Sequence, residues 1–201
     1  MAHVDETLIR FVHEYGAWTY AVLFLVIFCE TGLVATPFLP GDSLLFSAGA
    51  LAAAGALDLF SLCALLSLAA VAGDAANYAF GRTVVARWLS RSRLVNRSHL
   101  ARAESFYRTH GGKAIVLARF APILRTFAPF VAGMARMRYE RFLVFNLLGG
   151  VGWVGLCAGF GYLFGNLPVV KENFTAVLIA IVLVSLLPAV AGLVRDRREV
   201  L

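Results

Sequence analysis

The chain has 201 residues, of which 60% are hydrophobic and only 15% are charged, and its mean hydropathy is +0.79. Soluble domains are about half apolar and about a quarter charged, so this composition argues against a soluble domain and favours an integral membrane protein. The formal net charge is +6, but the arginines lie between and after apolar segments, which is typical of membrane topology signals and argues against a nucleic-acid-binding surface.

We predict a single all-α membrane domain over residues 1–201, with about four transmembrane helices. A helix rises about 1.5 Å per residue, so it needs about 20 residues to cross a hydrocarbon core about 30 Å thick. The N-terminus has no small-residue cleavage site, so we expect no cleaved signal peptide. The segments that reach or approach the length of a span are residues 11–29, 59–80, 142–164 and 174–194.

Two further apolar segments, residues 31–57 and 114–135, carry prolines and charges that a simple span does not tolerate. Proline removes a backbone donor, and a charge at the bilayer centre costs about 2.5–3.5 kcal/mol on insertion scales. Broken backbone at membrane depth persists only where protein or water surrounds it, so both segments are predicted to be re-entrant hairpins. The interrupting residues are Pro37, Pro40, Asp42, Arg119, Pro122, Arg125 and Pro129.

Basic residues decide the predicted topology, because cytoplasmic loops are enriched in Lys and Arg. Residues 82–113 hold eight such residues and residues 136–141 hold three, so both flanks of the 114–135 hairpin are placed in the cytoplasm. The 31–57 hairpin then enters from the opposite face, as in transporters built from inverted repeats, and the C-terminus is cytoplasmic. Residues 88–107 are predicted to form an amphipathic helix on the inner leaflet, with a solvated linker helix as the alternative. The sidedness of the N-terminus stays open.

Ionisable side chains inside a membrane face the protein interior or water, and by default they mark a functional site. The alternative is that they pair with one another and only hold the bundle together. For Asp74 the two interpretations are balanced, since Arg82 lies about two helical turns further along the same segment and could pair with it. Asn77 and Tyr78 are polar neighbours on that segment. The ionisable residues of the apolar segments are Glu30, Asp42, Asp74, Arg119 and Arg125.

Metal, cofactor and enzyme chemistry find little support in the sequence. The three cysteines lie far apart in apolar runs, which is typical of small buried side chains rather than of metal ligands or a disulfide framework. His99 and His110 lie in the basic region without a serine–histidine–aspartate set or metal-ligand spacing. We therefore expect no metal, no cofactor and no enzyme activity.

The order and spacing of the charged and proline residues resemble three motifs of the DedA family of membrane proteins, over about residues 17–165. One position differs, because Ala118 stands where many members have glycine. The motifs as they stand in this sequence are Glu30…Pro37-Phe38-Leu39-Pro40-Gly41-Asp42-Ser43, then Gly73-Asp74…Tyr78…Gly81-Arg82, then Arg119-Phe120-x-Pro122-x-x-Arg125-Thr126-x-x-Pro129-x-x-Ala132-Gly133.

The resemblance implies a fold of several spans with two opposed re-entrant hairpins, and a role in moving lipids across the bilayer. Bacterial members are associated with recycling undecaprenyl phosphate, the lipid carrier of envelope synthesis, which implies a multi-pass protein of the bacterial cytoplasmic membrane. The resemblance also implies that the acidic pair Glu30 and Asp42 and the arginine pair Arg119 and Arg125 are the functional residues. From the chemistry of these groups we predict that the arginines bind the phosphate and that the carboxylates couple transport to protons. Asp74, Pro37, Pro40, Pro122 and Pro129 support this site. The partners are an anionic lipid and protons, and a homo-oligomer is left open.

A mechanism follows from the chemistry of these groups. A guanidinium stays charged and forks onto phosphate oxygens, while carboxylates neutralise the arginines until protonation releases them. Moving an anion toward a negative interior costs about 2.3 kcal/mol per charge per 100 mV, and accompanying protons cancel that cost. This favours undecaprenyl phosphate over phosphatidylethanolamine. The alternatives are a phospholipid flippase or scramblase, a proton-coupled small-ion antiporter, and a purely structural membrane protein.

Overall fold

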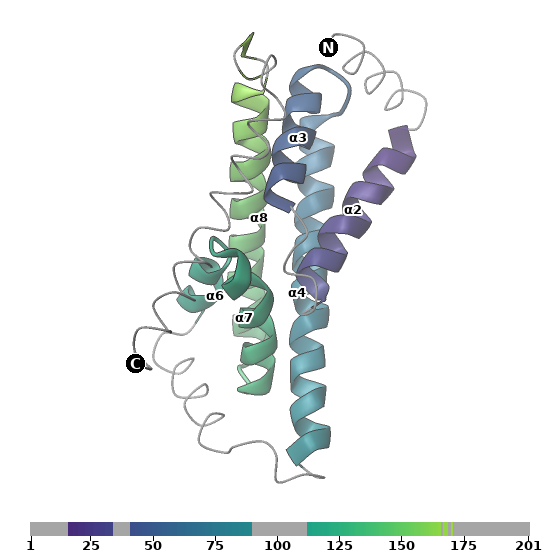
Figure 1. The fold of residues 1–201 in the computed structure, drawn as a ribbon. Coiled ribbons are helices and arrows are strands. Elements are labelled where there is room, and N and C mark those ends of the chain that lie inside the picture. The colour runs from purple at the N-terminus through teal and green to yellow at the C-terminus, as the bar shows by residue number, and fades with distance from the viewer. Residues whose placement is uncertain (1–15, 34–40, 90–111, 166, 169, 171–201) are drawn as a thin grey trace, which may run out of the picture. The chain divides into compact units, whose positions relative to one another are not determined.

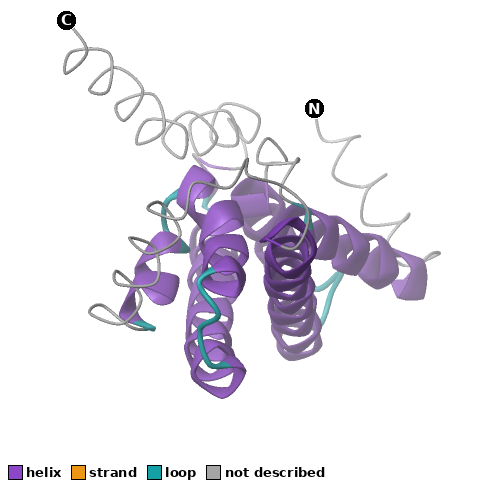
Figure 2. Ribbon diagram, turned by 90° about the horizontal axis from the view of Figure 1, so that it is seen from below, coloured by secondary structure: helices purple, strands orange, loops and turns teal. Residues whose placement is uncertain are grey.

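The computed structural model describes residues 16–33, 41–89, 112–165, 167–168 and 170. Within these ranges the secondary structure is helical throughout and contains no strand, as Figures 1 and 2 show. The all-α prediction is therefore confirmed for the described part of the chain. The helices are α2 (Gly16–Gly32), α3 (Gly41–Ala53), α4 (Leu59–Leu89), α6 (Lys113–Ala118), α7 (Pro122–Met134) and α8 (Tyr139–Phe164).

Two helices are long and apolar enough to cross a membrane, judged by length and composition. They are Leu59–Thr83 within α4 and Tyr139–Phe164, which is α8, and they match the predicted spans 59–80 and 142–164. Less than half of either span is buried, and large apolar side chains such as Phe80 and Phe160 are more than half exposed. Exposed apolar surface on this scale is typical of a protein that contacts lipid.

Several predicted elements extend beyond the described residues. Helix α2 covers the second part of the predicted span 11–29, while the span 174–194 lies outside the described residues, as do Pro37 and Pro40. Helix α4 continues to Leu89, beyond the predicted end at residue 80, because residues 81–89 contain no proline that would break the helix. The rest of the predicted amphipathic helix, from residue 90 onward, is also outside the described residues. The number of spans therefore stays a prediction.

Contacts divide the chain into two compact units, each assembled from separate segments. The first unit takes its described residues from 16–27, 41–67 and 151–170. The second unit takes its described residues from 28–33, 68–89 and 112–150. Helices α2, α4 and α8 contribute residues to both units. The expectation of one membrane domain stays a prediction.

In the first unit, helix α3 packs against the second half of α8 at backbone distance. A Cβ atom built on Gly49 of α3 would lie 2.0 Å from the carbonyl oxygen of Ala158, and one built on Gly161 of α8 would lie 2.0 Å from that of Phe46. Both values are far inside van der Waals contact, so only glycine fits. Small residues at a helix crossing let the two backbones approach, which is a common basis of helix packing in membranes.

We predict that Gly161→Ala destabilises the protein, because its methyl group would collide with the α3 backbone. The expected loss is about 1–3 kcal/mol, the usual cost of overpacking. Thermal unfolding in detergent should show a lower midpoint temperature. Gly159→Ala is the matched control, since a Cβ at Gly159 meets nothing within 4 Å. Equal midpoints for the two variants would contradict the close α3–α8 contact.

In the second unit, the predicted interruption near Pro122 is present. Helix α6 ends at Ala118, and Ala121 has an extended backbone (φ −118°, ψ 112°) before α7 begins at Pro122. The residue before a proline is pushed toward extended conformations, and proline suits the first turn of a helix because its missing N–H is not needed there. Pro129 does not end the helix, because α7 continues through it to Met134.

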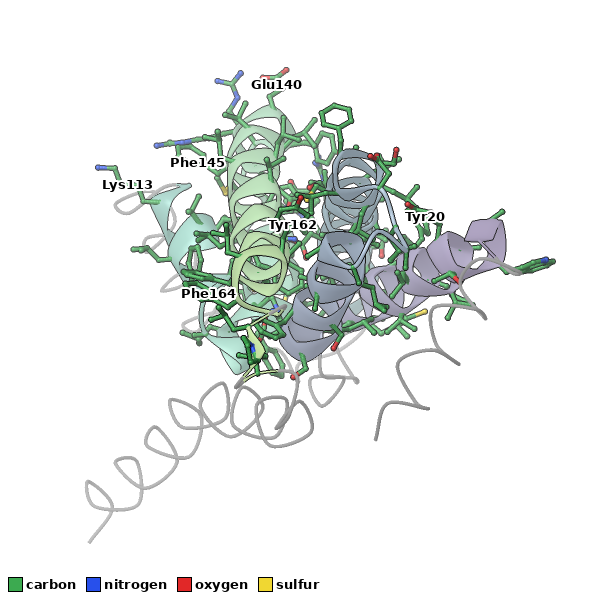
Figure 3. All side chains as sticks on the ribbon, turned by 90° about the horizontal axis from the view of Figure 1, so that it is seen from above. Tyr20, Lys113, Glu140, Phe145, Tyr162 and Phe164 are labelled. Atoms are coloured by element: carbon green, nitrogen blue, oxygen red, sulfur yellow. The ribbon has the colours of Figure 1, made fainter. Side chains whose placement is uncertain are left out.

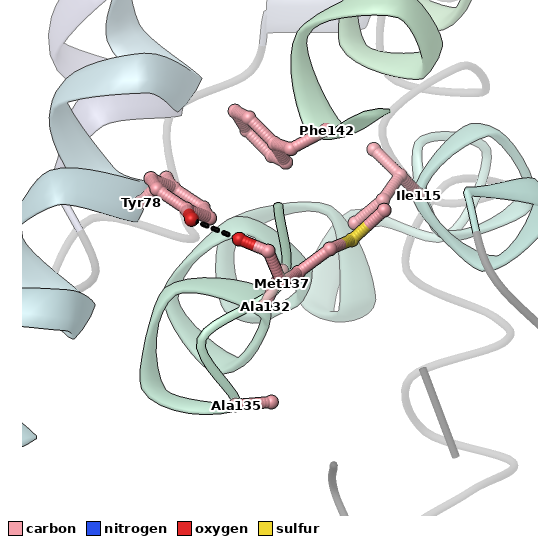
Figure 4. Packing of buried hydrophobic residues seen from close by; sticks show 6 residues of the cluster. All are labelled: Tyr78, Ile115, Ala132, Ala135, Met137 and Phe142. Atoms are coloured by element: carbon pink, nitrogen blue, oxygen red, sulfur yellow. Dashed lines mark hydrogen bonds between the residues drawn. The ribbon is translucent and has the colours of Figure 1, made fainter. Parts of the chain in front are cut away.

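The C-terminal end of α7 is closed by a Schellman motif. Arg136 has a left-handed backbone (φ 52°), its N–H donates to the carbonyl of Gly133, and the N–H of Met137 donates to that of Ala132. Tyr78 of α4 donates a hydrogen bond to the Met137 carbonyl, so the turn is also tied to α4 (Figure 4). Around it lies the buried cluster of Tyr78, Ile115, Ala132, Ala135, Met137 and Phe142.

We predict that Arg136→Gly stabilises the protein by about 0.5–1 kcal/mol, because glycine adopts the left-handed conformation without the Cβ penalty. Arg141→Gly is the matched control. Arg141 is exposed inside α8, where replacement by glycine costs about 1 kcal/mol of helix propensity. Thermal unfolding should therefore move in opposite directions for the two variants. A lower midpoint for Arg136→Gly would contradict the prediction.

Candidate functional site

Two buried ion pairs form the centre of the second unit. Nη1 of Arg119 donates to Oδ2 of Asp74, and Nη2 of Arg125 donates to Oε1 of Glu30. Their exposed fractions are 2% for Arg119, 1% for Asp74, 4% for Arg125 and 0% for Glu30. We call these four residues the charge quartet. Three of the four predicted core residues of the site, together with Asp74, therefore meet in one unit.

Arg119 follows the last residue of α6, where an amide on α8 holds its guanidinium in place. Oδ1 of Asn146 accepts from Nη1 of Arg119 at 2.7 Å, and Nδ2 of Asn146 donates to the carbonyl of Val71 at 3.0 Å. Gly149 of α8 leaves room for the side chain, since a Cβ on it would lie 3.3 Å from Cδ of Arg119, and a Cβ on Gly150 would lie 2.9 Å from Cγ2 of Val71. Asn146 thus links Arg119 to both α8 and α4.

Arg125 lies in the first turn of α7 and Glu30 in the last turn of α2, so their ion pair joins two helices. Asn77 of α4 fixes both sides of this pair. Its Nδ2 donates to the carbonyl of Thr31 at 3.2 Å and to the carbonyl of Thr126 at 2.7 Å. The residues immediately after Glu30 and Arg125 are therefore held by one buried amide.

The four charges also act on one another beyond their direct pairs. Arg125 interacts favourably with Asp74, Glu30 interacts favourably with Arg119, and the two guanidinium groups repel each other. Two positive and two negative groups make the quartet neutral. Its four side chains are buried, so a change in one of these charges is felt strongly by the other three.

Exposed charges of the same unit behave differently. Lys113 at the start of α6 and Glu140 at the start of α8 extend away from their helices, as Figure 3 shows. Glu140 pairs with Arg138 at 2.9 Å, with 83% of each side chain exposed. The burial of the quartet is therefore a property of its place in the unit and not of charged residues in general.

Asp42, which the sequence analysis groups with Glu30 as a proton-coupling residue, lies in a different setting from the quartet. It lies in the first turn of α3 and belongs to the first unit. There, Nε1 of the buried Trp153 donates to Oδ1 of Asp42 at 2.7 Å. The structure thus brings Glu30, Asp74, Arg119 and Arg125 together in the second unit and gives Asp42 an indole partner in the first.

The balanced interpretation of Asp74 can now be refined. Its partner is Arg119 and not Arg82, whose side chain is exposed on α4. Sequence reasoning missed Asn146 and Trp153 altogether. The available signal for Asn146 was an isolated amide in an apolar span, because buried polar side chains in membrane helices have hydrogen-bond partners.

The site contains no recognisable metal centre in the part of the chain that the structure describes. No group of three or more His, Cys, Asp or Glu residues is placed to hold a metal ion there. The charged groups instead suit an oxyanion, because guanidinium groups hold phosphate oxygens through paired N–H donors.

Comparisons with known proteins agree with the site residues in pointing to one family. The VTT domain family matches residues 39–163. The chain is 50% identical over 200 residues to Protein DedA of Escherichia coli K12, covering 98% of this chain and 91% of that protein. It is 40% identical over 167 residues to an uncharacterized membrane protein of Mycobacterium leprae, covering 82% and 75%. It is 35% identical over 181 residues to the inner membrane protein YghB of Escherichia coli K12, covering 87% and 80%. No solved structure matches the chain.

The pairing within the quartet can be tested by double-mutant cycles on the free energy of unfolding in mixed micelles. We expect coupling of about 1–3 kcal/mol between Arg119→Gln and Asp74→Asn, and between Arg125→Gln and Glu30→Gln, because residues in direct contact couple on this scale. The exposed pair Arg138–Glu140 is the control and should couple by less than about 1 kcal/mol. Stronger coupling between Arg119 and Glu30 than between Arg119 and Asp74 would contradict the assigned pairs.

Proposed function

The chain belongs to the DedA family of VTT-domain membrane proteins, and from this premise we propose that it moves an anionic lipid phosphate across the bilayer together with protons. The observation that carries the proposal is the buried, neutral charge quartet. The family is a family of membrane proteins, and the proposal assigns this chain transport and no enzyme activity.

Stability alone gives little reason for the quartet. Replacing a buried ion pair by well-packed apolar side chains is often neutral or stabilising by about 1–4 kcal/mol, because desolvation offsets the attraction. Two such pairs within the second unit are therefore better explained by a ligand than by a need to hold helices together. This argument supports a functional role for Arg119 and Arg125 over the purely structural alternative.

Arg119 and Arg125 have the chemistry of a phosphate site. Each presents a planar fork of N–H donors that stays charged at working pH, and each is released for an anion only when its carboxylate partner is discharged. A lipid phosphate is the anion best suited to such a site in a protein whose helices expose apolar surface to the bilayer. Undecaprenyl phosphate is the proposed substrate, with a phospholipid such as phosphatidylethanolamine as the alternative.

Proton coupling is assigned to Glu30 and Asp42. Glu30 pairs directly with Arg125, so its protonation would break the ion pair and free the guanidinium. Asp42 is a partly buried carboxylate at the start of α3, where Trp153 holds one of its oxygens. Cotransported protons would also cancel the charge that the phosphate carries through the membrane potential.

The lengths of α3 and α7 support the proposal of two re-entrant hairpins. Each has 13 residues, which corresponds to roughly 20 Å of helix and falls short of a hydrocarbon core about 30 Å thick. The break at Ala121–Pro122 divides the 114–135 segment as a hairpin requires. We place the protein in the bacterial inner membrane with a cytoplasmic C-terminus, as the basic residues Arg195, Arg197 and Arg198 favour.

The proposal is tested by reconstituting the full chain in liposomes and following undecaprenyl phosphate translocation with and without a pH gradient. We expect translocation to need the gradient and to fall at least about tenfold in Arg125→Ala and Glu30→Gln, once thermal unfolding has shown that both variants fold. The first variant lacks a donor for the phosphate, and the second lacks an acid that can take up a proton. Arg141→Ala, which removes an exposed arginine of α8 that lies outside the three motifs, is the matched control and should transport normally.

Phosphatidylethanolamine is run in parallel to separate the lipid alternatives. Movement of phosphatidylethanolamine without undecaprenyl phosphate would favour the phospholipid flippase. Proton flux that depends on an added cation, with no movement of either lipid, would overturn the proposal in favour of an ion antiporter.

A further inference from the structure

Two buried oxygen atoms on α4 have no hydrogen-bond donor among the residues that the structure describes. Asp74 uses Oδ2 for its pair with Arg119, while its Oδ1 is buried and has no hydrogen-bond partner within the described part of the chain. Oδ1 of Asn77, a fully buried residue, also has no hydrogen-bond donor among the described residues. Buried polar atoms in native proteins are nearly always satisfied, so two orphaned acceptors on one helix call for an explanation.

The orientation of the Asn77 amide is fixed by its neighbours. Its Nδ2 donates to the carbonyls of Thr31 and Thr126, and a flipped amide would place its oxygen against these two acceptors. Oδ1 of Asn77 must therefore point away from the carbonyls of Thr31 and Thr126. Residues three apart on a helix are neighbours on one face, with Cβ atoms about 5–6 Å apart. Asn77 therefore lies on the same face of α4 as Asp74 and carries an acceptor that no described donor uses.

We propose that Asp74 takes up a proton when a lipid phosphate binds Arg119, and that Oδ1 of Asn77 accepts the hydrogen bond of the protonated carboxyl. The inference rests on the proposed function and adds Asp74 to its proton-coupling residues. A proton from water forms the O–H bond on Asp74, the Arg119–Asp74 ion pair breaks, and the freed guanidinium donates to a phosphate oxygen. Protonation of Glu30 frees Arg125 in the same way.

Charge balance requires this step. If the phosphate displaced Asp74 from Arg119 without protonation, an uncompensated carboxylate would remain buried beside the bound anion, which is strongly unfavourable. The described charged groups that act on Asp74 are Arg119 after α6 and Arg125 of α7, while Glu30 of α2 acts on Arg119. Helix α8 contributes the neutral Asn146. A phosphate that engages both arginines therefore leaves two carboxylates to be neutralised.

A metal cation fits the orphaned oxygens less well than a proton. Hard cations take six or more oxygen ligands, whereas Asp74 and Asn77 offer one orphaned oxygen each. Two guanidinium groups close to Asp74 would also repel a cation. A proton needs only one oxygen for its covalent bond and a second as hydrogen-bond acceptor, and these two side chains supply both.

The test counts the protons taken up when undecaprenyl phosphate binds to the purified full chain in detergent. Isothermal titration in buffers of different ionisation heat gives this number at constant pH. We expect wild-type protein to take up protons on binding, and Asp74→Asn to take up about one proton fewer per lipid, because the amide cannot titrate. Asp74→Glu, which keeps an acid at this position, should retain proton uptake.

Asp58→Asn is the matched control for the same chemical change. Asp58 is exposed before α4, where Ser61 donates hydrogen bonds to its carboxyl and holds the pKa of Asp58 below the usual value. This carboxyl stays ionised through the titration, and asparagine also caps a helix well. Asp58→Asn should therefore leave the proton count unchanged.

Asp74→Asn leaves Arg119 without its counter-charge, so thermal unfolding must first show that the variant folds. If it does not, the neutral pair Asp74→Asn/Arg119→Gln replaces it and should also take up about one proton fewer, with lipid held by Arg125. A proton count equal to wild type in these variants, or binding that requires sodium instead of protons, would overturn the role of Asp74 alone. If wild-type protein does not bind the lipid, the proposed function and this inference both fall.

Discussion

The second unit depends on one constraint: two guanidinium groups that cannot lose their charge are buried in apolar protein and must be compensated there. Arg119 and Arg125 each meet a carboxylate, from α4 and α2 respectively, and this requirement brings four helices together. Two amides complete the arrangement, Asn146 by binding Arg119 and Asn77 by tying α2 and α7 to α4. The charges thus determine where polar and small residues stand in otherwise apolar helices.

Local backbone features help to place these charges. Pro122 starts α7 after an extended Ala121, so Arg119 and Arg125 lie on either side of a break and not on one continuous helix. At the other end of α7, the left-handed turn at Arg136 stops the helix and presents the Met137 carbonyl to Tyr78. Helix α7 is short and both of its ends are fixed by local structure, so it holds Arg125 in a defined position, as pre-organised binding requires.

The sequence predicted the two long spans and the break near Pro122, because hydropathy and proline are local signals. Intramembrane charge is also a local signal, and it singled out the members of the charge quartet, but it grouped Asp42 with them, and their role stays a prediction. It did not predict the pairing, which is set by tertiary contact. Helix geometry alone already argues against pairing Arg82 with Asp74, because residues eight apart on a helix are about 12 Å apart along its axis. The isolated Asn146 in α8 was also readable as a polar partner, and it was overlooked because glycines dominate that segment.

Neutrality of the quartet also bears on which lipids the proposed site accepts. A phosphate monoester that carries two negative charges matches two free guanidinium groups once both carboxylates are protonated, so the occupied site stays neutral. A zwitterionic phospholipid brings one phosphate charge and its own ammonium group, and it could balance the quartet by pairing its amine with a carboxylate, without protons. The same electrostatic condition that makes the empty site stable therefore links proton uptake to the charge of the lipid. The need to balance the charges of Arg119 and Arg125 therefore determines both whether protons are taken up and which class of lipid the site accepts.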